Sequence, residues 1–355
     1  MKNLKINVLS VLLVAFAFTS CGNDEPIAIN PPLESVIENL NNGIIEGILS
    51  EEYTLDSAIQ YRLSGSFIID ESGTLNIPGG TTVIADAGGT EVYIAVLQGG
   101  KININGNAGS PVLISSANGS PGDWGGLTLC GKASTSAGVD ASAEVGGFIY
   151  GGSDDTDSSG IIRYLQITGT GAQINPESQY NGISFYGVGS GTLVDHVAII
   201  NGSDDGVEFF GGTVAVSNLY LENNDDDSID WTEGWSGTIT NAYISHTVAG
   251  FSTAFEGDKD NANPTFTNIT AVSSVGGTAL QFKKESGATI SGLRLVGYDV
   301  DLDMKDNGAL SNVQIDGTTA DATLYTGETN KYLLNSGKNA APVDLNKWSW
   351  IDDSF

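Results

Sequence analysis

Short runs of alternating apolar and polar residues, separated by glycine, asparagine and serine, fill the chain from about residue 66 to about residue 325. Five runs share one order, an apolar residue, then Ser or Thr, then Asn or Gly, then an apolar residue. They are Val216-Ser217-Asn218-Leu219, Ile239-Thr240-Asn241-Ala242, Phe266-Thr267-Asn268-Ile269, Ile290-Ser291-Gly292-Leu293 and Leu310-Ser311-Asn312-Val313. Their third residues stand 23, 27, 24 and 20 positions apart. Repetition at a spacing in the twenties predicts a solenoid with one coil per repeat.

The residue types within the repeats decide which solenoid forms. Short segments rich in Val, Ile, Phe and Thr, interrupted by 47 glycines, favour strands and turns. The chain lacks the Leu framework and helical segments of leucine-rich repeats. We therefore predict an all-β fold, a single-stranded right-handed parallel β-helix. The recurring Asn is expected at a turn, with its amide bonded to the Asn of the coils above and below.

The periodic stretch has no linker break, so one elongated domain of about ten coils is expected. Residues 1–20 are predicted as a lipoprotein signal peptide, 21–49 as a lipidated tether and N-terminal cap, and 50–355 as the β-helix with a C-terminal cap. Open end coils would be adhesive sheet edges and need covers. Leu33–Leu49, as a short helix or irregular cap, and Trp348-Ser349-Trp350-Ile351 are the expected covers.

The N-terminus has the features of an export signal. Lys2 and Lys5 precede an apolar run from Val8 to Phe18 that is too short to span a bilayer, and small residues then lead to Cys21. This is the processing pattern of bacterial lipoproteins, so Cys21 is the predicted lipidation site that joins the chain to outer-membrane lipid. The alternative is an ordinary secretory signal with an incidental Cys. Asn23-Asp24-Glu25 resembles the signal that exports Bacteroidetes lipoproteins to the cell surface.

Charge narrows the range of partners. The formal net charge is −29, from 43 acidic and 14 basic residues, and cleavage of the signal would remove two lysines and no acid. Such a surface repels nucleic acid and anionic lipid, so a nucleic-acid partner is excluded. For most scattered acids, a solvated coat that keeps the solenoid soluble is the simplest explanation.

Clustered acids need a different explanation. Asp205-Gly206-Val207-Glu208 and Asp227-Ser228-Ile229-Asp230 repeat one pattern at an offset of 22 residues, so their carboxylates should stack on successive coils, and Glu256 should continue the column. Stacked like charges repel, and Ca²⁺ is the cation whose oxygen ligands match Asp and Glu. The predicted metal ligands are Asp205, Glu208, Asp226, Asp227, Asp230, Glu256 and Asp258. Solvated or lysine-paired carboxylates, and a catalytic metal, remain alternatives.

Further candidates lie beside this column. Lys283 is expected to point outward on the following coil, either as a Brønsted base near a metal or as a salt-bridge partner of the acids. Trp231 and Trp235 are candidate glycan contacts, although either could equally be a core residue. There is no nucleophile elbow, metal-binding His pair or phosphate loop.

Several phrases of the chain resemble a family of β-helical outer-membrane lipoproteins of Bacteroidetes and spirochaetes. They are Pro121-Gly122-Asp123-Trp124-Gly125-Gly126-Leu127, Gly131-Lys132-Ala133, Tyr150-Gly151-Gly152, Asn181-Gly182-Ile183, Ser203 to Gly212, and Asp225-Asp226-Asp227. The resemblance implies the fold and the membrane address but no activity, since the molecular function of that family is unassigned. Because some relatives lie near TonB-dependent transporter genes, it also suggests a transporter as a surface partner.

A narrower resemblance concerns Asp226, Asp227 and Asp230, with Asp205 one coil earlier and Lys283 later. The group is similar to the calcium-binding acids and lysine base of family 9 pectate lyases, which share the pectin-lyase-like solenoid. The first aspartate is about three residues too close and the lysine considerably too far along the chain.

Three classes of function follow. The favoured one is a non-enzymatic surface lipoprotein whose Ca²⁺-ordered acidic face belongs to a scaffold that binds polysaccharide or a transporter. The alternatives are a Ca²⁺-dependent polysaccharide lyase with Lys283 as base, and a purely structural surface rod. Fold alone does not choose between them.

Overall fold

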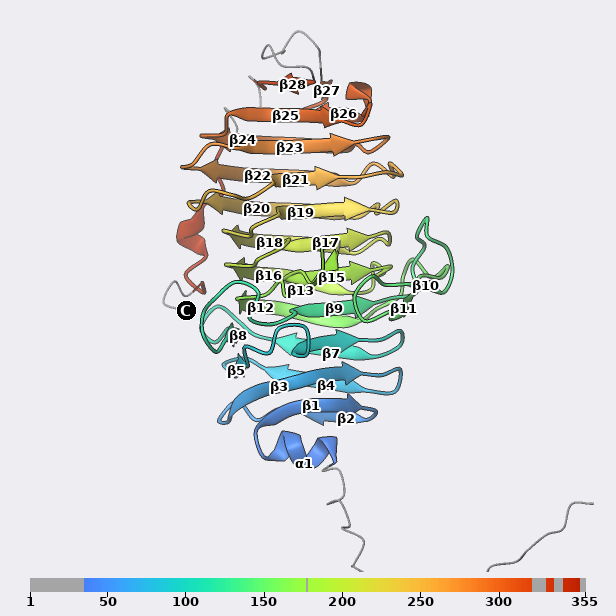
Figure 1. Ribbon diagram of the computed structural model, residues 1–355, viewed down its shortest axis with the longest axis vertical. Coiled ribbons are helices and arrows are strands. Elements are labelled where there is room, and N and C mark those ends of the chain that lie inside the picture. The colour runs from blue at the N-terminus through green and yellow to red at the C-terminus, as the bar shows by residue number, and fades with distance from the viewer. Residues whose placement is uncertain (1–34, 177, 321–329, 335–340, 352–355) are drawn as a thin grey trace, which may run out of the picture. The chain divides into compact units, whose positions relative to one another are not determined.

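The computed structural model describes residues 35–176, 178–320, 330–334 and 341–351. The predicted signal peptide and Cys21 lie outside the described residues. The described chain winds through short parallel strands stacked coil on coil, with the helix α1 (Val36–Asn41) before the first coil (Figure 1). The predicted all-β parallel β-helix is confirmed. Over these residues, no helix has the length and apolar character needed to cross a membrane.

Three ladders of parallel strands form the sides of the coils, and each ladder contains ten strands in the described chain. The first ladder consists of β1 (Ile44–Leu49), β3 (Gln60–Ile69), β6 (Tyr93–Val96), β9 (Leu127–Cys130), β15 (Ile183–Tyr186), β17 (Val207–Phe210), β19 (Asp227–Thr232), β21 (Thr253–Gly257), β23 (Thr278–Lys283) and β25 (Val300–Lys305).

The second ladder consists of β2 (Glu52–Thr54), β4 (Thr74–Pro78), β7 (Lys101–Asn105), the first halves of six long strands, and β26 (Val313–Ile315). The long strands are β12 (Gly160–Thr168), β16 (Leu193–Ile200), β18 (Ala215–Glu222), β20 (Thr238–His246), β22 (Thr265–Ser273) and β24 (Ala288–Val296). Their second halves form the third ladder, together with the first halves of β1 and β3, β5 (Thr82–Ala85) and β8 (Val112–Ser116).

Alternation within each strand builds the core. On the first ladder, Val207, Ile229, Phe255, Leu280 and Leu302 stand in register and are at most 1% exposed. The residues between them point outward, since side chains alternate along a strand. Inside, Phe185, Phe209 and Trp235 stack with ring centroids 4.9 and 4.1 Å apart. Offset aromatic pairs of this kind contribute about 0.5–1.5 kcal/mol each beyond the area they bury.

A ladder of asparagines marks the bend between the second and third ladders. Asn218, Asn241 and Asn268 occupy the same bend on successive coils with φ of 56°, 59° and 60°, a left-handed conformation that Asn tolerates. Asn241 Nδ2 donates to Asn218 Oδ1 at 3.1 Å, and Asn268 Nδ2 donates to Asn241 Oδ1 at 2.6 Å. The predicted amide ladder at the turn is therefore confirmed for these three coils.

The fifth repeat of the sequence pattern is out of register. Ile290 pairs with Ile315 rather than with Leu310, so Asn312 does not stand in register with Gly292. Asn312 instead ends the 3₁₀ helix η1 (Leu310–Asn312) and donates to the carbonyl of Glu285. The alignment that put Asn312 in the ladder was wrong by five residues, because an inserted turn precedes the last strand.

The N-terminal cover lies within the expected segment but is shorter. Helix α1 begins after Ser35, whose Oγ accepts from the backbone nitrogen of Glu38 at 3.2 Å, and Leu40 is buried against the first coil. Strand β1 then begins at Ile44, so the β-helix starts six residues before the predicted boundary at 50.

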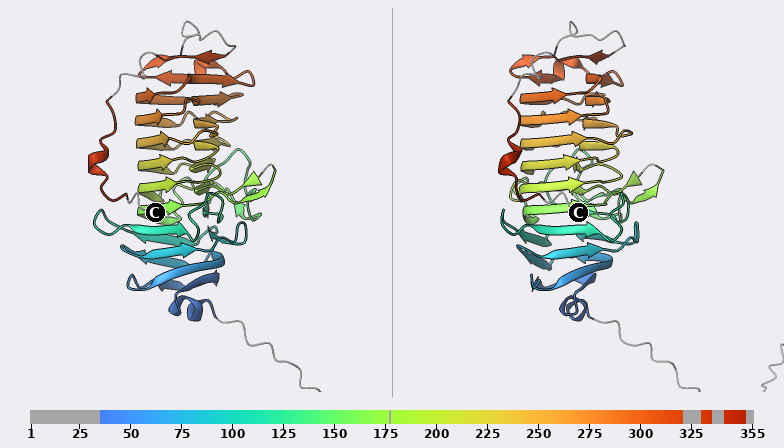
Figure 2. Two further views of the ribbon diagram at one scale, coloured as in Figure 1. Left: turned by 60° about the vertical axis from the view of Figure 1, so that its left-hand side comes forward. Right: turned by 90° about the vertical axis from the view of Figure 1, so that its left-hand side faces the viewer.

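The C-terminal cover differs from the prediction. The last coil is followed by β27 (Thr318–Thr319) and β28 (Lys331–Tyr332), which pair antiparallel with β26 and β25. Residues 341–351, with the 3₁₀ helix η4 (Leu345–Lys347), run back along the side of the stack instead (Figures 1 and 2). Trp348 and Trp350 are buried against Ala198, Ile200 and Tyr220 on the outer side of the third ladder. We call residues 341–351 the strap.

Two loops carry small hairpins outside the coils. The strands β10 (Ala141–Ser142) and β11 (Ile149–Tyr150) pair antiparallel in one loop, and β13 (Gln173–Asn175) and β14 (Ser178–Gln179) pair antiparallel in the other. In Figure 1, β10 and β11 project beside the middle coils.

The asparagine ladder predicts a graded response to substitution. Asn241→Gly removes both ladder hydrogen bonds but keeps the left-handed backbone accessible, at a cost of about 1–3 kcal/mol. Asn241→Ala removes the same bonds and adds about 1–2 kcal/mol of backbone strain. Thermal melting of both variants should therefore order the midpoints as wild type, then Gly, then Ala. Asn312→Ala, outside the ladder, is the control, and equal midpoints for wild type and Asn241→Gly would remove the ladder's energetic role.

Candidate functional site

Carboxylates from successive coils stand in vertical register on the outer side of the first ladder. Glu208 pairs with Asp230 and Asp230 with Glu256, so all three occupy equivalent positions on β17, β19 and β21. We call Glu208, Asp230 and Glu256 the strand column. One turn earlier on their coils, the backbone nitrogen of Asp227 donates to Asp205 Oδ1 at 2.9 Å. The stacking expected from the 22-residue offset is present.

Close approach of the backbone sets this alignment. A Cβ at Gly206 would lie 2.6 Å from the carbonyl oxygen of Ser228, so only glycine allows the two coils to meet at this point. Gly206 N donates to the carbonyl of Asp227, which ties the two turns together at 2.9 Å. The neighbouring aspartates are therefore held above each other by main-chain bonds rather than by attraction between their side chains.

The stacked acids form three overlapping groups. In each group, one carboxylate oxygen per residue lies within 4.8 Å of the others. The groups are Asp204, Asp205 and Asp226; Asp205, Glu208 and Asp230; and Asp227, Asp230 and Glu256. Six of the seven predicted metal ligands thus converge, and Asp204 joins them. Asp204 was missed, although it stands 22 residues before Asp226 and repeats the same offset.

Burial and mutual repulsion raise the pKa values of these acids. Desolvation first, and the charges of neighbouring carboxylates second, hold the pKa of Asp205, Glu208, Asp227 and Asp230 well above their usual values. Asp205 and Asp227 are only 5% and 3% exposed. Desolvation also raises the pKa of Asp204 to about 7, against a hydrogen bond from Gln179. A charged column of this kind requires a compensating cation or bound protons.

A polar hollow of about 330 Å³ opens onto the first two groups. Its lining includes Asp204, Asp205, Glu208, Asp226 and Asp230, and the two hairpin loops add Glu144, Gln173, Pro176 and Gln179. Glu144 was not a sequence candidate. It lies about 60 residues before the acidic motifs, between β10 and β11, and only the fold brings that loop over the column.

Buried polar atoms without hydrogen-bond partners lie among the acids. Asp230 Oδ1 is buried and accepts no hydrogen bond within the described chain. Asn181 and Gln281, each 2% exposed, donate through their amide nitrogens to Glu208 at 2.7 Å and to Glu256 at 3.0 Å. Their amide oxygens accept no bond from any described residue. Since buried polar atoms are normally satisfied, these oxygens mark a place for a ligand that accepts electron pairs.

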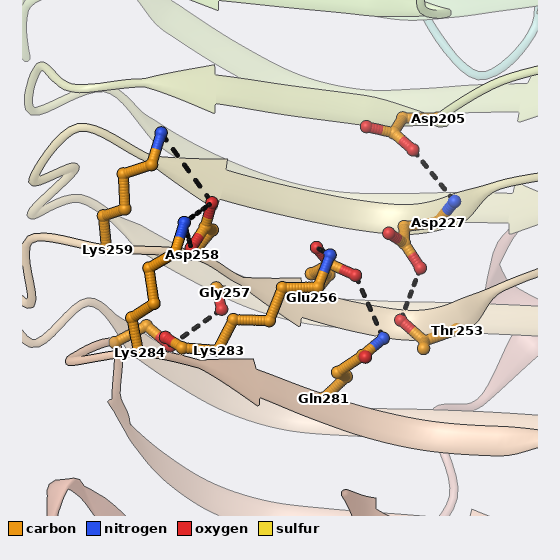
Figure 3. A network of polar contacts seen from close by, with 11 residues as sticks. Asp205, Asp227, Thr253, Glu256, Gly257, Asp258, Lys259, Gln281, Lys283 and Lys284 are labelled. Atoms are coloured by element: carbon orange, nitrogen blue, oxygen red, sulfur yellow. Dashed lines mark hydrogen bonds and ion pairs between the residues drawn. The ribbon is translucent and has the colours of Figure 1, made fainter. Parts of the chain in front are cut away.

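Asp258 does not join the cluster. Its carboxylate faces Lys284 at 3.1 Å and Lys259 at 3.8 Å, as Figure 3 shows, and it belongs to none of the three groups. The prediction of Asp258 as a metal ligand was therefore wrong. Asp258 follows Gly257 at the end of β21, where the chain turns away from the strand column.

Lys283 does reach the acids, as the salt-bridge partner that the sequence allowed. Its ammonium is paired with Glu256 Oε1, and Gln281 donates to the other oxygen of the same carboxylate (Figure 3). Burial alone would lower the pKa of Lys283, but the hydrogen bond to Glu256 and the charges of Glu256, Asp227 and Asp230 raise it overall. In this arrangement, Lys283 is an ammonium rather than a base, and it does not line the polar hollow.

The two candidate glycan contacts are core residues. Trp231 is 2% exposed and packs against Phe266 at 5.0 Å, and Trp235 is fully buried with its indole nitrogen bonded to the carbonyl of Val214. The prediction that Trp231 and Trp235 contact a glycan was wrong. Trp231 alternates with Asp230 along β19 and so points inward, while Trp235 folds back into the coil interior.

The fold and the acidic column together define a parallel β-helix with an acidic face. The family model of the pectate-lyase-like β-helix domain matches residues 47–347, and the chain belongs to this family. No curated protein and no solved structure gives a match.

Proposed function

We propose that this chain is a cell-surface lipoprotein whose acidic β-helix binds Ca²⁺ and serves as a scaffold for polysaccharide or for an outer-membrane transporter. The observation that carries the cation part is the set of three overlapping carboxylate groups, which includes the buried and unpartnered Asp230 Oδ1. Asp205, Glu208, Asp227 and Asp230 would supply the charged ligands, with Asp204, Asp226 and Glu256 at the two ends.

The donor set fits a hard, oxygen-seeking cation. Ca²⁺ takes six to eight oxygen ligands from carboxylates, amides and water, and tolerates irregular geometry. The cluster offers carboxylates together with the amide oxygens of Asn181 and Gln281, and it contains no histidine or cysteine. When bound, Ca²⁺ would offset two of the negative charges in the stack and so reduce the repulsion among its carboxylates.

Calcium should therefore raise the thermal midpoint of the wild type relative to chelator. At a free calcium concentration 100 times the dissociation constant, the expected gain is about 2.7 kcal/mol. Asp230→Asn should lose most of this gain and, in chelator, should melt above the wild type, because it removes one charge from a column of like charges. Melting with calcium and with chelator checks both signs.

Asp258→Asn is the matched control. It removes an acid on the neighbouring turn that is paired with lysines, and we expect it to keep the calcium-dependent gain while costing at most about 1 kcal/mol. If the wild type melts at the same temperature in calcium and in chelator, the carboxylates are simply protonated or solvated, and the cation part of the proposal fails.

The proposed location at the cell surface rests on features of the sequence. Cys21 follows an apolar segment of signal-peptide length, and the phrases around Asp123-Trp124 and Ser203 to Gly212 resemble surface lipoproteins of Bacteroidetes. The family's pectate-lyase-like name supports a link with polysaccharide. The net charge of −29 favours a ligand reached through a bound cation, or an uncharged one.

Replacing Cys21 with Ser should release the protein from the outer-membrane fraction, because no acyl chain would then hold it in the bilayer. Fractionation of the native host followed by immunoblotting measures this, with Cys130→Ser as the control, since Cys130 is buried. Co-purification from detergent-solubilised membranes then tests for a partner. A variant without Cys21 that stays in the membrane would contradict the anchor, and wild type that emerges alone would favour a purely structural rod.

A second candidate is a Ca²⁺-dependent polysaccharide lyase, favoured by the position of Lys283 beside Asp227, Asp230 and Glu256. A lyase base must accept a proton from the substrate, whereas Glu256 holds Lys283 as a cation. We therefore expect no growth of ultraviolet absorbance when the protein is incubated with polygalacturonate or alginate in calcium. Growth that disappears in Lys283→Ala would establish the lyase instead.

A further inference from the structure

The three carboxylate groups of the acidic column have different surroundings. We call Asp227, Asp230 and Glu256 the third group. All the acids of the first two groups line the polar hollow, whereas neither Asp227 nor Glu256 is among the described residues that line it. Asp230 belongs to the second group as well as the third, and it does face the hollow. An ion that enters through the hollow therefore reaches the first two groups directly and the third group only through Asp230.

A cation of the chain already lies at the third group. Lys283 ends β23, two residues beyond Gln281, and its side chain extends toward Glu256, where its ammonium pairs with Oε1 (Figure 3). The carboxylate that it meets is buried, since Glu256 is only 6% exposed. The negative charges of Asp227 and Asp230 lie close enough to act on the same ammonium. One positive charge of the chain therefore serves all three acids of the third group.

The third group also has the oxygen ligands of a metal site. Gln281 stands in register with Glu256, is 2% exposed, and donates through its amide nitrogen to Glu256 Oε2 at 3.0 Å. Its amide oxygen, like Asp230 Oδ1, is buried and accepts no bond from any described residue. Buried oxygens are normally satisfied, and Ca²⁺ coordinates both carboxylate and amide oxygens. With its ammonium removed, the third group would thus suit a divalent ion.

An ammonium and a divalent ion compete for this group, because both need the oxygens of Glu256 and because like charges repel at short range. Lys283 is tethered beside Glu256, so its effective concentration there stays high whatever the concentration of free cations. We propose that Lys283 is a built-in cation that fills the third group, so that bound Ca²⁺ is confined to the two groups that face the hollow. This inference rests on the calcium site proposed above.

Loss of the ammonium should add an ion rather than move one. Successive coils lie about 4.8 Å apart. In sites that hold two metal ions, the ions lie about 3.5–4 Å apart and share ligands. Because Asp230 belongs to both the second and the third group, its carboxylate can bridge an ion in each. A variant without the charge of Lys283 therefore has room for one more divalent ion than the wild type.

Counting bound calcium tests this. The full chain is dialysed to equilibrium against calcium well above the dissociation constant, and the metal bound per chain is measured. Lys283→Ala and Lys283→Met both remove the charge, and Met keeps an apolar stem of similar length, so each should bind one Ca²⁺ more than the wild type. Lys283→Arg keeps the charge and should bind the wild-type number. Lys284→Ala is the matched control, since Lys284 pairs with Asp258, outside the three groups.

Melting in chelator provides a second measurement. Lys283→Ala and Lys283→Met should melt below the wild type there, because the third group has lost its cation, and calcium should raise their midpoints by more than it raises that of the wild type. Lys283→Arg should restore the wild-type behaviour in both solutions.

The outcomes separate this inference from the calcium site itself. Equal calcium counts in the wild type, Lys283→Ala and Lys283→Met would overturn the role of Lys283 and leave the calcium site standing. A wild type that binds no calcium would remove the proposed calcium site, whereas one ion bound only by the two neutral variants would still support Lys283 as the cation of the third group. Calcium bound by none of these proteins would overturn both.

Discussion

The structure depends on the register of parallel main-chain hydrogen bonds between successive coils. A single coil is too thin to enclose a hydrophobic core. Its stability therefore comes from packing and hydrogen bonding with the coils above and below it. The register places every outward side chain above a counterpart, and it does so without regard to whether that pair attracts or repels. Asn218, Asn241 and Asn268 gain from this alignment through bonded amides. The same alignment is destabilising at Glu208, Asp230 and Glu256, because it stacks their negative charges.

A column of like charges can persist when the packing of the other residues in each coil stabilises the fold by more than the repulsion destabilises it. It can also persist when a bound ligand offsets the repulsion. On the first ladder, the inward partners of these acids are fully buried apolar residues such as Ile229, Phe255 and Leu280. At about 25 cal/mol per Å² of apolar surface, one such side chain contributes about 1.5–3 kcal/mol, the size of a modest electrostatic penalty. The core can therefore hold the carboxylates in place as a preformed site, and a cation then binds without first having to assemble it.

The sequence predicted what depends on local periodicity, and failed where distant segments meet. Alternation and the 22-residue offset were enough to align Asp205 with Asp227 and Glu208 with Asp230. They could not place Glu144, because it lies in a hairpin loop far along the chain that folds over the column. They could not place the strap either, because Trp348 and Trp350 give the same sequence pattern whether they cover an end or a side of the stack. Residue type alone left Trp231 as either a glycan contact or a core residue, and the alternation that places Asp230 outward turns Trp231 inward. Asp258 fits the composition of the cluster, but the chain leaves the strand after Gly257.

The register that places each side chain above its counterpart also explains why the sides of one solenoid differ in chemistry. Because coils repeat, one substitution affects one step of a column, and a column acquires a collective property only when several coils carry the same residue type. Carboxylates repeated at Glu208, Asp230 and Glu256 concentrate charge beyond what isolated surface acids would do. Hydroxyls repeated at Thr240, Thr267 and Ser291 form an uncharged column on another ladder. The ladder between them, with Tyr220 and Tyr243 stacked in a column, would be an adhesive apolar surface if the strap did not cover it. Each side therefore takes its character from the residue that recurs, and the coil spacing converts that recurrence into a surface.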